Sequence, residues 1–407
     1  MKRRLANLPL HGGKAPPWLF RRMTRLAGAV TMAIVDEFGA AEMLRRLSDP
    51  WWFQAFGCVL GFDWHSSGVT TVTCGALKEA FRLFGPDLGI CVAGGKGGTS
   101  RRTPDEIAAA SDRFGITGGD RLIYASRMSA KVDSAAVQDG FQLYHHVFLF
   151  TRDGQWCVVQ QGLNGEQKSA RRYHWLGERV DDFVCEPHGG ISDLSPDPVA
   201  SLARSTPEPT LLNMVAGGAG ANRSGSAAIV RENPDWVSEQ IERYTEGPTL
   251  FAPRNHRLMP RDVNRQHLRR ILISAHEQQP GSFEALLGTQ GVGPATVLSL
   301  SLLAELIFDA PASHRDPAER FRAPAHVPAE QQHRADQRPE KRHWADQRPE
   351  ERHWADYAYA HGGKDGTPFP VDRETYDRNI AILTQAVRKA RVGENEKMNA
   401  LRRLSVR

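Results

Sequence analysis

The sequence is poor in cysteine and has no long apolar run. Its five cysteines form no C-x-x-C pair, which argues against a zinc ribbon or a dense disulfide framework and predicts reduced thiols. The longest apolar stretch, residues 294–308, contains serines and is too short to span a bilayer. No apolar signal-peptide core follows the basic start, because Pro9 and the following glycines interrupt it. We therefore expect a cytoplasmic protein with no membrane partner.

A large excess of one charge is also missing. The chain has 52 basic and 47 acidic residues, a net charge of +5, and 40% of its 407 residues are hydrophobic. That much apolar material is enough for two or three domains with real cores. The small positive excess favours a polyanionic partner without identifying it.

Composition divides the chain into five parts and predicts an α+β fold. We expect a mixed α/β domain over 1–195, a flexible linker over 196–232, an all-α domain over 233–310, a low-complexity insert over 311–356 and a helical segment over 357–407. In the insert, Arg-His-Trp-Ala-Asp begins at Arg342 and again at Arg352, a duplication of low hydrophobicity. In the first domain, Asp153-Gly154 between two strand-like runs predicts a β-hairpin.

The stretch from Phe283 to Phe308 carries the strongest functional signal. An apolar helix is broken by Gly288 and by Gly291-Val292-Gly293, and Pro294 opens a second helix that includes Thr296. Such a bend exposes backbone N–H groups at the start of the second helix, where a phosphate oxygen fits. The stretch resembles the helix-hairpin-helix motif, whose usual partner is the DNA backbone. An ordinary helical hairpin in a core is the alternative.

Two basic features accompany this bend. Arg261, Arg265 and Arg269 recur at one helical face just before it, as phosphate neutralisation requires, although a solvated helix face would look the same. Lys96 lies in the glycine-rich loop 94–102. This loop does not end in Gly-Lys-Ser or Gly-Lys-Thr, so it is not a nucleoside-triphosphate loop. It is either a DNA-contacting loop or a plain surface loop.

The N-terminal part concentrates side chains suited to metal-assisted phosphodiester hydrolysis. We expect Asp63, Asp133 and Asp139 to hold Mg²⁺ or Mn²⁺, and His65 or His145 to act as a ligand or general base. The spacing in Asp63-Trp64-His65 and Lys131-Val132-Asp133 places each pair on one face of a strand. Lys131 would stabilise the charge on the phosphorane. A core or surface histidine is the alternative for each histidine taken singly.

These features give a first hypothesis, a DNA-binding protein of DNA processing or repair with metal-dependent nuclease activity. A second is a helix-hairpin-helix glycosylase in which Asp372 of Pro370-Val371-Asp372 assists base excision. Ala295 stands where such enzymes can carry a Schiff-base lysine, and the spacing to Asp372 is longer than theirs, so Asp372 can equally be a helix cap. A third hypothesis is a non-catalytic DNA-binding adaptor.

The chain as a whole resembles a bacterial and archaeal family catalogued as domain of unknown function 763. The residues that carry the resemblance are Leu8–Gly13, Phe62–Thr71, Tyr144–Phe148, Val159–Gly162, Ala170–Trp175 and His361–Gly366. The resemblance covers nearly everything except the insert at 321–356. It implies no particular activity, but its polar motifs coincide with several of the residues chosen above on chemical grounds.

Overall fold

The computed structural model describes residues 6–9, 15–61, 67–165, 169–188, 211–245 and 264–317, with short pieces between 381 and 398. Four predicted site residues lie outside these ranges: Asp63, His65, Arg261 and Asp372. The repeat insert also lies outside them. No helix among the residues that are described is long and apolar enough to cross a membrane.

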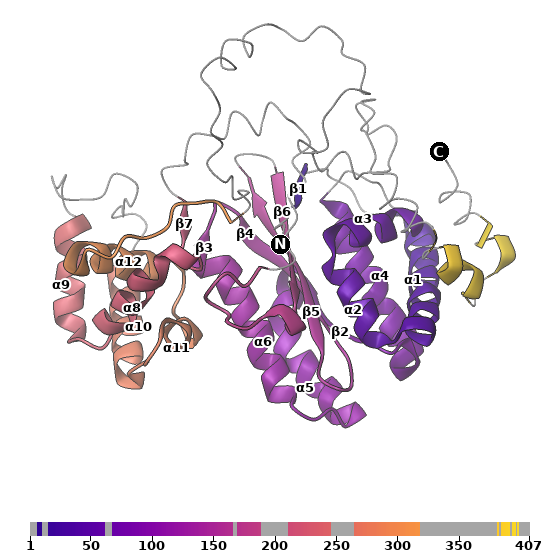
Figure 1. The fold of residues 1–407 in the computed structure, drawn as a ribbon, viewed down its shortest axis with the longest axis horizontal. Helices are drawn as coiled ribbons and strands as arrows, with labels where there is room; N and C mark the ends of the chain where they lie inside the picture. Colours follow the sequence, from indigo (N-terminus) through magenta and orange to yellow (C-terminus); the bar gives the residue numbers. More distant parts are fainter. Residues whose placement is uncertain are drawn as a thin grey trace, which may run out of the picture.

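A five-stranded antiparallel sheet forms the centre of the molecule (Figure 1). Its strand order is β1-β6-β5-β4-β2. The strands are β1 (Ala6–Pro9), β2 (Cys91–Lys96), β4 (Gln142–Phe150), β5 (Trp156–Asn164) and β6 (Ser169–Leu176). The predicted β-hairpin is confirmed as β4 and β5, which pair from Phe150 opposite Trp156 back to Gln142 opposite Leu163. Gly154 in its turn has a φ of 84°, a conformation that glycine adopts without steric cost.

Helices cover both faces of this sheet. On one face lie α1 (Pro17–Phe38), α2 (Ala40–Ser48), α3 (Pro50–Val59) and α4 (Gly68–Phe84); on the other lie α5 (Thr103–Phe114) and α6 (Gly119–Lys131). Because strand side chains alternate between faces, β4 supplies Val147 and Leu149 to the first core and Phe148 and Phe150 to the second. Short helical turns join these elements: η1 (Gly85–Leu88), η2 (Gly97–Arg102), η3 (Val132–Ala136) and η4 (Gly177–Arg179).

The C-terminal part is helical, which confirms the predicted α+β class. It comprises α8 (Gly220–Ile229), α9 (Pro234–Thr245), α10 (Arg265–Gln278), α11 (Phe283–Gly288) and α12 (Pro294–Phe308), preceded by η5 (Gly217–Ala219) and by β7 (Leu212–Asn213), which pairs with β3 (Val137–Gln138). Farther along the chain, residues 384–389 are helical and bury Ala386 and Val387 in the core on the α1 side.

The linker predicted over 196–232 differs from the structure beyond Leu211. Residues 211–232 contain β7 and α8 and are packed into the fold. Asn222 is buried and donates to the carbonyls of Ser301 (2.9 Å) and Ala310 (2.7 Å). A Cβ added to Gly225 would lie 2.9 Å from the Cβ of Ala304. The small residues that favoured a linker in the sequence thus serve the close packing of α8 on α12.

The predicted division into separate N- and C-terminal domains also needs revision. One buried cluster contains Phe148 and Trp175 from the sheet together with Leu286 of α11 and Leu300 of α12. The helical part therefore shares a core with the α5–α6 side of the sheet. As a result, the bend between α11 and α12 is held beside α6 (Figure 1).

Candidate functional site

A cavity of about 570 Å³ lies between α6, the start of α5, strand β4 and the end of α11. We call it the α6 cavity. Its lining residues are Ser100, Arg101, Thr103, Pro104, Asp120, Ile123, Tyr124, Ser126, Arg127, Met128, Ala130, Lys131, Leu143, His146 and Gly288. The set joins an apolar wall to a few polar and basic side chains, which is the usual composition of a ligand pocket.

Two buried polar side chains, Ser126 and His146, lie at the floor of this cavity. The Ser126 hydroxyl is 2.9 Å from Nε2 of His146, and Nδ1 of His146 is 2.7 Å from Oε1 of Gln160. Because the Gln160 amide donates to the Ser129 carbonyl (3.0 Å) and to Asp133, its oxygen is turned toward His146 and can only accept. His146 therefore carries its proton on Nδ1 and accepts from Ser126 at Nε2.

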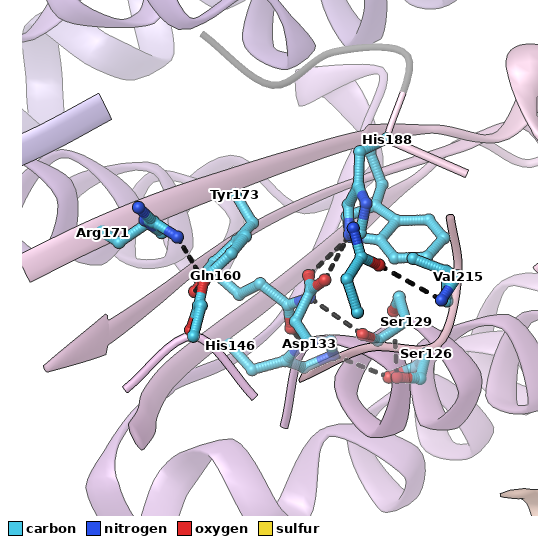
Figure 2. A network of polar contacts seen from close by, with 12 residues as sticks. Ser126, Ser129, Asp133, His146, Gln160, Arg171, Tyr173, His188 and Val215 are labelled. Carbon is cyan, nitrogen blue, oxygen red and sulfur yellow. Dashed lines mark hydrogen bonds and ion pairs between the residues drawn. The ribbon is translucent and has the colours of Figure 1, made fainter. Parts of the chain in front are cut away.

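The protonation of His146 follows from its surroundings. Burial lowers the pKa of His146 below its ordinary value, while the hydrogen bond to Gln160 and the charge of Asp133 act in the opposite direction. The imidazole is thus neutral at pH 7. Its orientation is fixed from the sheet side through Gln160 (Figure 2).

Asp133 anchors the network behind Gln160. One of its carboxylate oxygens contacts Nε2 of His188, and the other accepts from the Trp175 indole at 2.8 Å and from the Gln160 amide (Figure 2). The Asp133 side chain is fully buried. Each oxygen therefore already has a donor, as a buried carboxylate requires.

A hydroxyl that donates to an oriented neutral imidazole has the geometry of an activated nucleophile. Ser126 lies in the interior of α6, however, where backbone N–H groups are used by the helix itself. The amide next to the hydroxyl is thus not free to stabilise an oxyanion, which acyl or phosphoryl transfer would need. The arrangement is better suited to binding a ligand at a rigid polar floor than to covalent catalysis.

Asp139 belongs to a second buried network, at the far end of the same sheet face. It accepts from Arg171 (2.5 Å), from the Tyr173 hydroxyl (2.8 Å) and from the Phe141 amide (3.2 Å). Arg171 also contacts Asp316 at 2.8 Å. Burial raises the pKa of Asp139 above its ordinary value, although Arg171 opposes this. Arg171 on β6 thus joins Asp139 and the sheet to Asp316 in the chain after α12.

The predicted metal site does not fit the carboxylates that are described. Asp133 and Asp139 lie in separate networks and are surrounded by hydrogen-bond donors, whereas Mg²⁺ and Mn²⁺ need free oxygen ligands. Within the described ranges no group of three histidine, cysteine, aspartate or glutamate side chains could hold a metal ion. The two other predicted ligands, Asp63 and His65, lie outside those ranges.

Asp133 and Lys131 do not share one face, in contrast to the strand geometry predicted for them. Lys131 ends α6, and Asp133 lies in the π-helical turn η3. In helical geometry, residues two apart point in different directions. Asp133 therefore faces the sheet and Lys131 faces the C-terminal helices.

The chain turns between α11 and α12 at residues 289–293, which we call the bend. Lys131 holds this bend in place. Its ammonium group donates to the carbonyls of Leu287 (2.6 Å), Thr289 (2.5 Å) and Val292 (3.3 Å). Burial lowers the pKa of Lys131 to about 8. Since these contacts occupy the three protons of an ammonium group, Lys131 positions the bend and is not directed at a bound phosphate as predicted.

The bend is partly exposed, and amides in it and at the start of α12 are free. Gly291 has a φ of 88°, which allows the chain to reverse direction there. Within the described residues, the N–H groups of Gly291, Gly293 and Ala295 have no acceptor. Gly288 and Gly291 are exposed and Gly293 is partly exposed, whereas the Thr296 side chain is buried and faces the core. Of the predicted phosphate contacts, the glycines are therefore accessible and the Thr296 hydroxyl is not.

His145 points away from the α6 cavity. It neighbours His146 in β4, so the two side chains lie on opposite faces of the sheet, and His145 packs on the side of α1–α4. It is 1% exposed, and burial lowers its pKa to about 3. His146, not the predicted His145, is thus the histidine that lines the cavity.

The arginines of α10 are engaged with α9. Arg269 donates to Asp235 at 2.6 Å, and Arg265 lies 3.8 Å from Glu242. These pairs are exposed and weak, so a phosphate could replace the carboxylate. Lys96 is exposed and lies over the Tyr144 ring, 5.7 Å from its centroid. Nearer the bend, Arg101 and Arg127 are exposed and form no ion pair within the described residues.

Sequence reasoning selected Lys131 and Gly288 of the cavity lining, each for another role, and did not select Ser126, His146, Tyr124 or Arg127. His145 and His146 are adjacent in a strand, so one histidine faces each side of the sheet. No local pattern showed which side carries the cavity, because α6 and the bend reach it from distant parts of the chain. His188 belongs to a His-Gly-Gly triplet that also occurs at His11 and His361.

Comparison with known proteins adds family membership and no activity. No curated protein and no solved structure matches the chain. The model of the family described as "Protein of unknown function (DUF763)" matches residues 4–371. That match spans the sheet, the α6 cavity and the bend, and the chain therefore belongs to this family.

Proposed function

We propose that the protein binds DNA through the sugar-phosphate backbone, in DNA processing or repair, and that the bend is the principal contact. The observation that supports this most directly is the group of free N–H donors at Gly291, Gly293 and Ala295, on a partly exposed turn and the helix start that follows it. Backbone amides at the start of a helix bind anionic oxygens well. This is the contact that the resemblance to a helix-hairpin-helix motif implies.

Two further features support a phosphate contact at this place. Lys131 fixes the bend through three carbonyls, so its amides are held in position before any ligand arrives. A fixed site loses less entropy on binding. Arg101 and Arg127 line the neighbouring cavity and have no acidic partner within the described ranges, so their charge is available for phosphates.

The binding test uses fluorescence anisotropy with labelled duplex and single-stranded DNA at several KCl concentrations. Gly291→Ala should weaken binding about tenfold, because an alanine at a φ of 88° is strained by roughly 1–2 kcal/mol and shifts the bend. Gly281→Ala is the matched control, since it changes an exposed glycine with ordinary φ and open space around it. Equal affinity of both variants would contradict a role for the bend.

The charges are tested separately. Arg127→Glu should weaken binding to duplex, and the slope of log K against log[salt] should become shallower by about 1 for each phosphate that the protein no longer neutralises. Arg121→Glu makes the same change on the same helix, at an exposed position outside the cavity lining, and should have a smaller effect.

Nuclease and glycosylase activity remain predictions that go beyond binding. The nuclease hypothesis names Asp63 and His65 together with Asp133, Asp139, His145 and Lys131, and the glycosylase hypothesis names Asp372. Asp63, His65 and Asp372 lie outside the described residues. Labelled duplex, forked and single-stranded DNA with Mg²⁺ or Mn²⁺ tests the first. No cleavage, or cleavage unchanged in Asp133→Asn and Asp63→Asn, rejects it. Alkali-labile sites formed on damaged duplex without metal would select the second.

A further inference from the structure

We infer that the α6 cavity receives one unpaired nucleobase of a DNA strand whose backbone is held at the bend. This inference rests on the proposed function and names the form of DNA that the site would select. It concerns the cavity, whereas the proposal above concerns the bend.

The cavity and the bend share a wall. Gly288, the last residue of α11, lines the cavity and immediately precedes the bend. Lys131 also lines the cavity, and its ammonium group contacts the carbonyls of the bend. A strand with its phosphates at the bend would therefore pass next to the cavity, and one of its bases could turn into it.

The size of the cavity suits this ligand. At about 570 Å³ it lies in the range of pockets that enclose small molecules. It is too small for a duplex, whose bases are stacked and paired. Entry of a base thus requires an unpaired or flipped nucleotide.

Tyr124 supplies an aromatic wall that is fixed in place. Its hydroxyl donates to Glu284 of α11, and its ring packs edge-on against Phe183 at 5.8 Å between centroids. The side chain is nevertheless 44% exposed, so part of the ring is free for contact. Bases stack on such rings whatever their sequence, and a ring already held on two sides loses little freedom when a base arrives.

The polar and basic side chains of the cavity also suit a nucleotide. The Ser126 hydroxyl donates to His146, which leaves its lone pairs to accept from an N–H group of a base. Arg101 and Arg127 at the wall can neutralise the flanking phosphates. Asp120 is the acidic side chain in the lining, so the cavity retains a positive excess with Lys131.

The experiment compares two fluorescent single strands of about ten nucleotides, one of normal bases and one with the central positions replaced by abasic tetrahydrofuran units. The normal strand should bind the full-length protein about tenfold more tightly. Tyr124→Ala should remove that difference while leaving the affinity for the abasic strand, and Tyr124→Phe should keep most of the difference. Ala130→Leu, which fills the cavity from α6, should act like Tyr124→Ala.

A second measurement locates the base. A strand carrying 5-iodouracil should photo-crosslink to Tyr124 or His146 and not in the Tyr124→Ala protein. Equal affinity for both strands, with crosslinks elsewhere, would overturn this inference while leaving backbone binding intact. Displacement of the normal strand by free deoxynucleoside monophosphates would assign the cavity to a free nucleotide and also overturn it. Absence of binding to any strand would instead refute the proposed function itself.

Discussion

Acid should destabilise this protein well before its carboxylates are protonated, because three histidines are buried in neutral form. Burial lowers the pKa of His145 to about 3, and it lowers the pKa values of His146 and His174 as well. In the unfolded chain each imidazole has its ordinary pKa near 6.5. Between pH 6.5 and about 3, the unfolded state therefore binds protons that the folded His145 does not.

The direction and size of the pH effect on stability follow from that difference in bound protons. Stability from a depressed histidine pKa is present above pH 6.5 and is lost as pH falls through this window. Each pH unit costs about 1.4 kcal/mol for one such group, so at pH 5 His145 alone should lower the free energy of unfolding by about 2 kcal/mol. His146 and His174 act in the same direction. The loss is large against a total stability of roughly 5–15 kcal/mol.

The assay is urea unfolding followed by tryptophan fluorescence at pH 7 and pH 5. His145→Leu should reduce the difference between the two pH values by about 2 kcal/mol, because a leucine has no proton to exclude. His267→Gln, at an exposed position on α10, should leave the difference unchanged. An unchanged pH dependence in His145→Leu would refute the assignment of a buried neutral histidine.

Three other changes have expected outcomes. Lys131→Met should lower the free energy of unfolding by about 2 kcal/mol, measured in urea, because it removes the charged donor of three carbonyls; faster hydrogen exchange in residues 289–293 should accompany it, and unchanged exchange would contradict the role as a clamp. Asp133→Asn should lower the free energy of unfolding by about 3 kcal/mol, since an amide places a donor against the donors of the buried network. Asp235→Asn, in an exposed pair, should lower it by less than about 1 kcal/mol. Equal losses in the two variants would contradict the role of Asp133. Gly28→Ala should lower the free energy of unfolding by roughly 1–3 kcal/mol, and the thermal midpoint with it, because its Cβ would lie 2.2 Å from the Phe84 ring. Gly98→Ala, in open space, should leave the thermal midpoint unchanged.

The sequence predictions that proved correct depend on the chemistry of a few neighbouring residues. Asp153-Gly154 specified a tight hairpin turn, and the structure places a φ of 84° at that glycine. Pro294 and the apolar spacing after it gave the start of α12, with Pro294 at its first position. Both features depend on a few consecutive residues, so nothing distant in the chain could change them.

The features of the fold and of the site that could not be predicted from the sequence depend on long-range packing. Lys131 and Asp133 look like neighbours on a strand, yet a helical turn sends one to the bend and the other to the sheet. The Gly- and Ala-rich segment around Asn222 resembles a linker, but those small side chains let α8 approach α12. In each case, the deciding contacts come from residues more than 70 positions away in the chain.

The central claim, that the free amides of the bend contact DNA, is tested most directly by nuclear magnetic resonance on deuterated protein labelled with ¹⁵N-glycine. Adding a short DNA at low salt should shift the amide signals of Gly291 and Gly293, while Gly39, between α1 and α2 on the other face of the sheet, keeps its own. Saturable shifts that leave Gly291 and Gly293 unmoved, or no shifts at all, would contradict the claim.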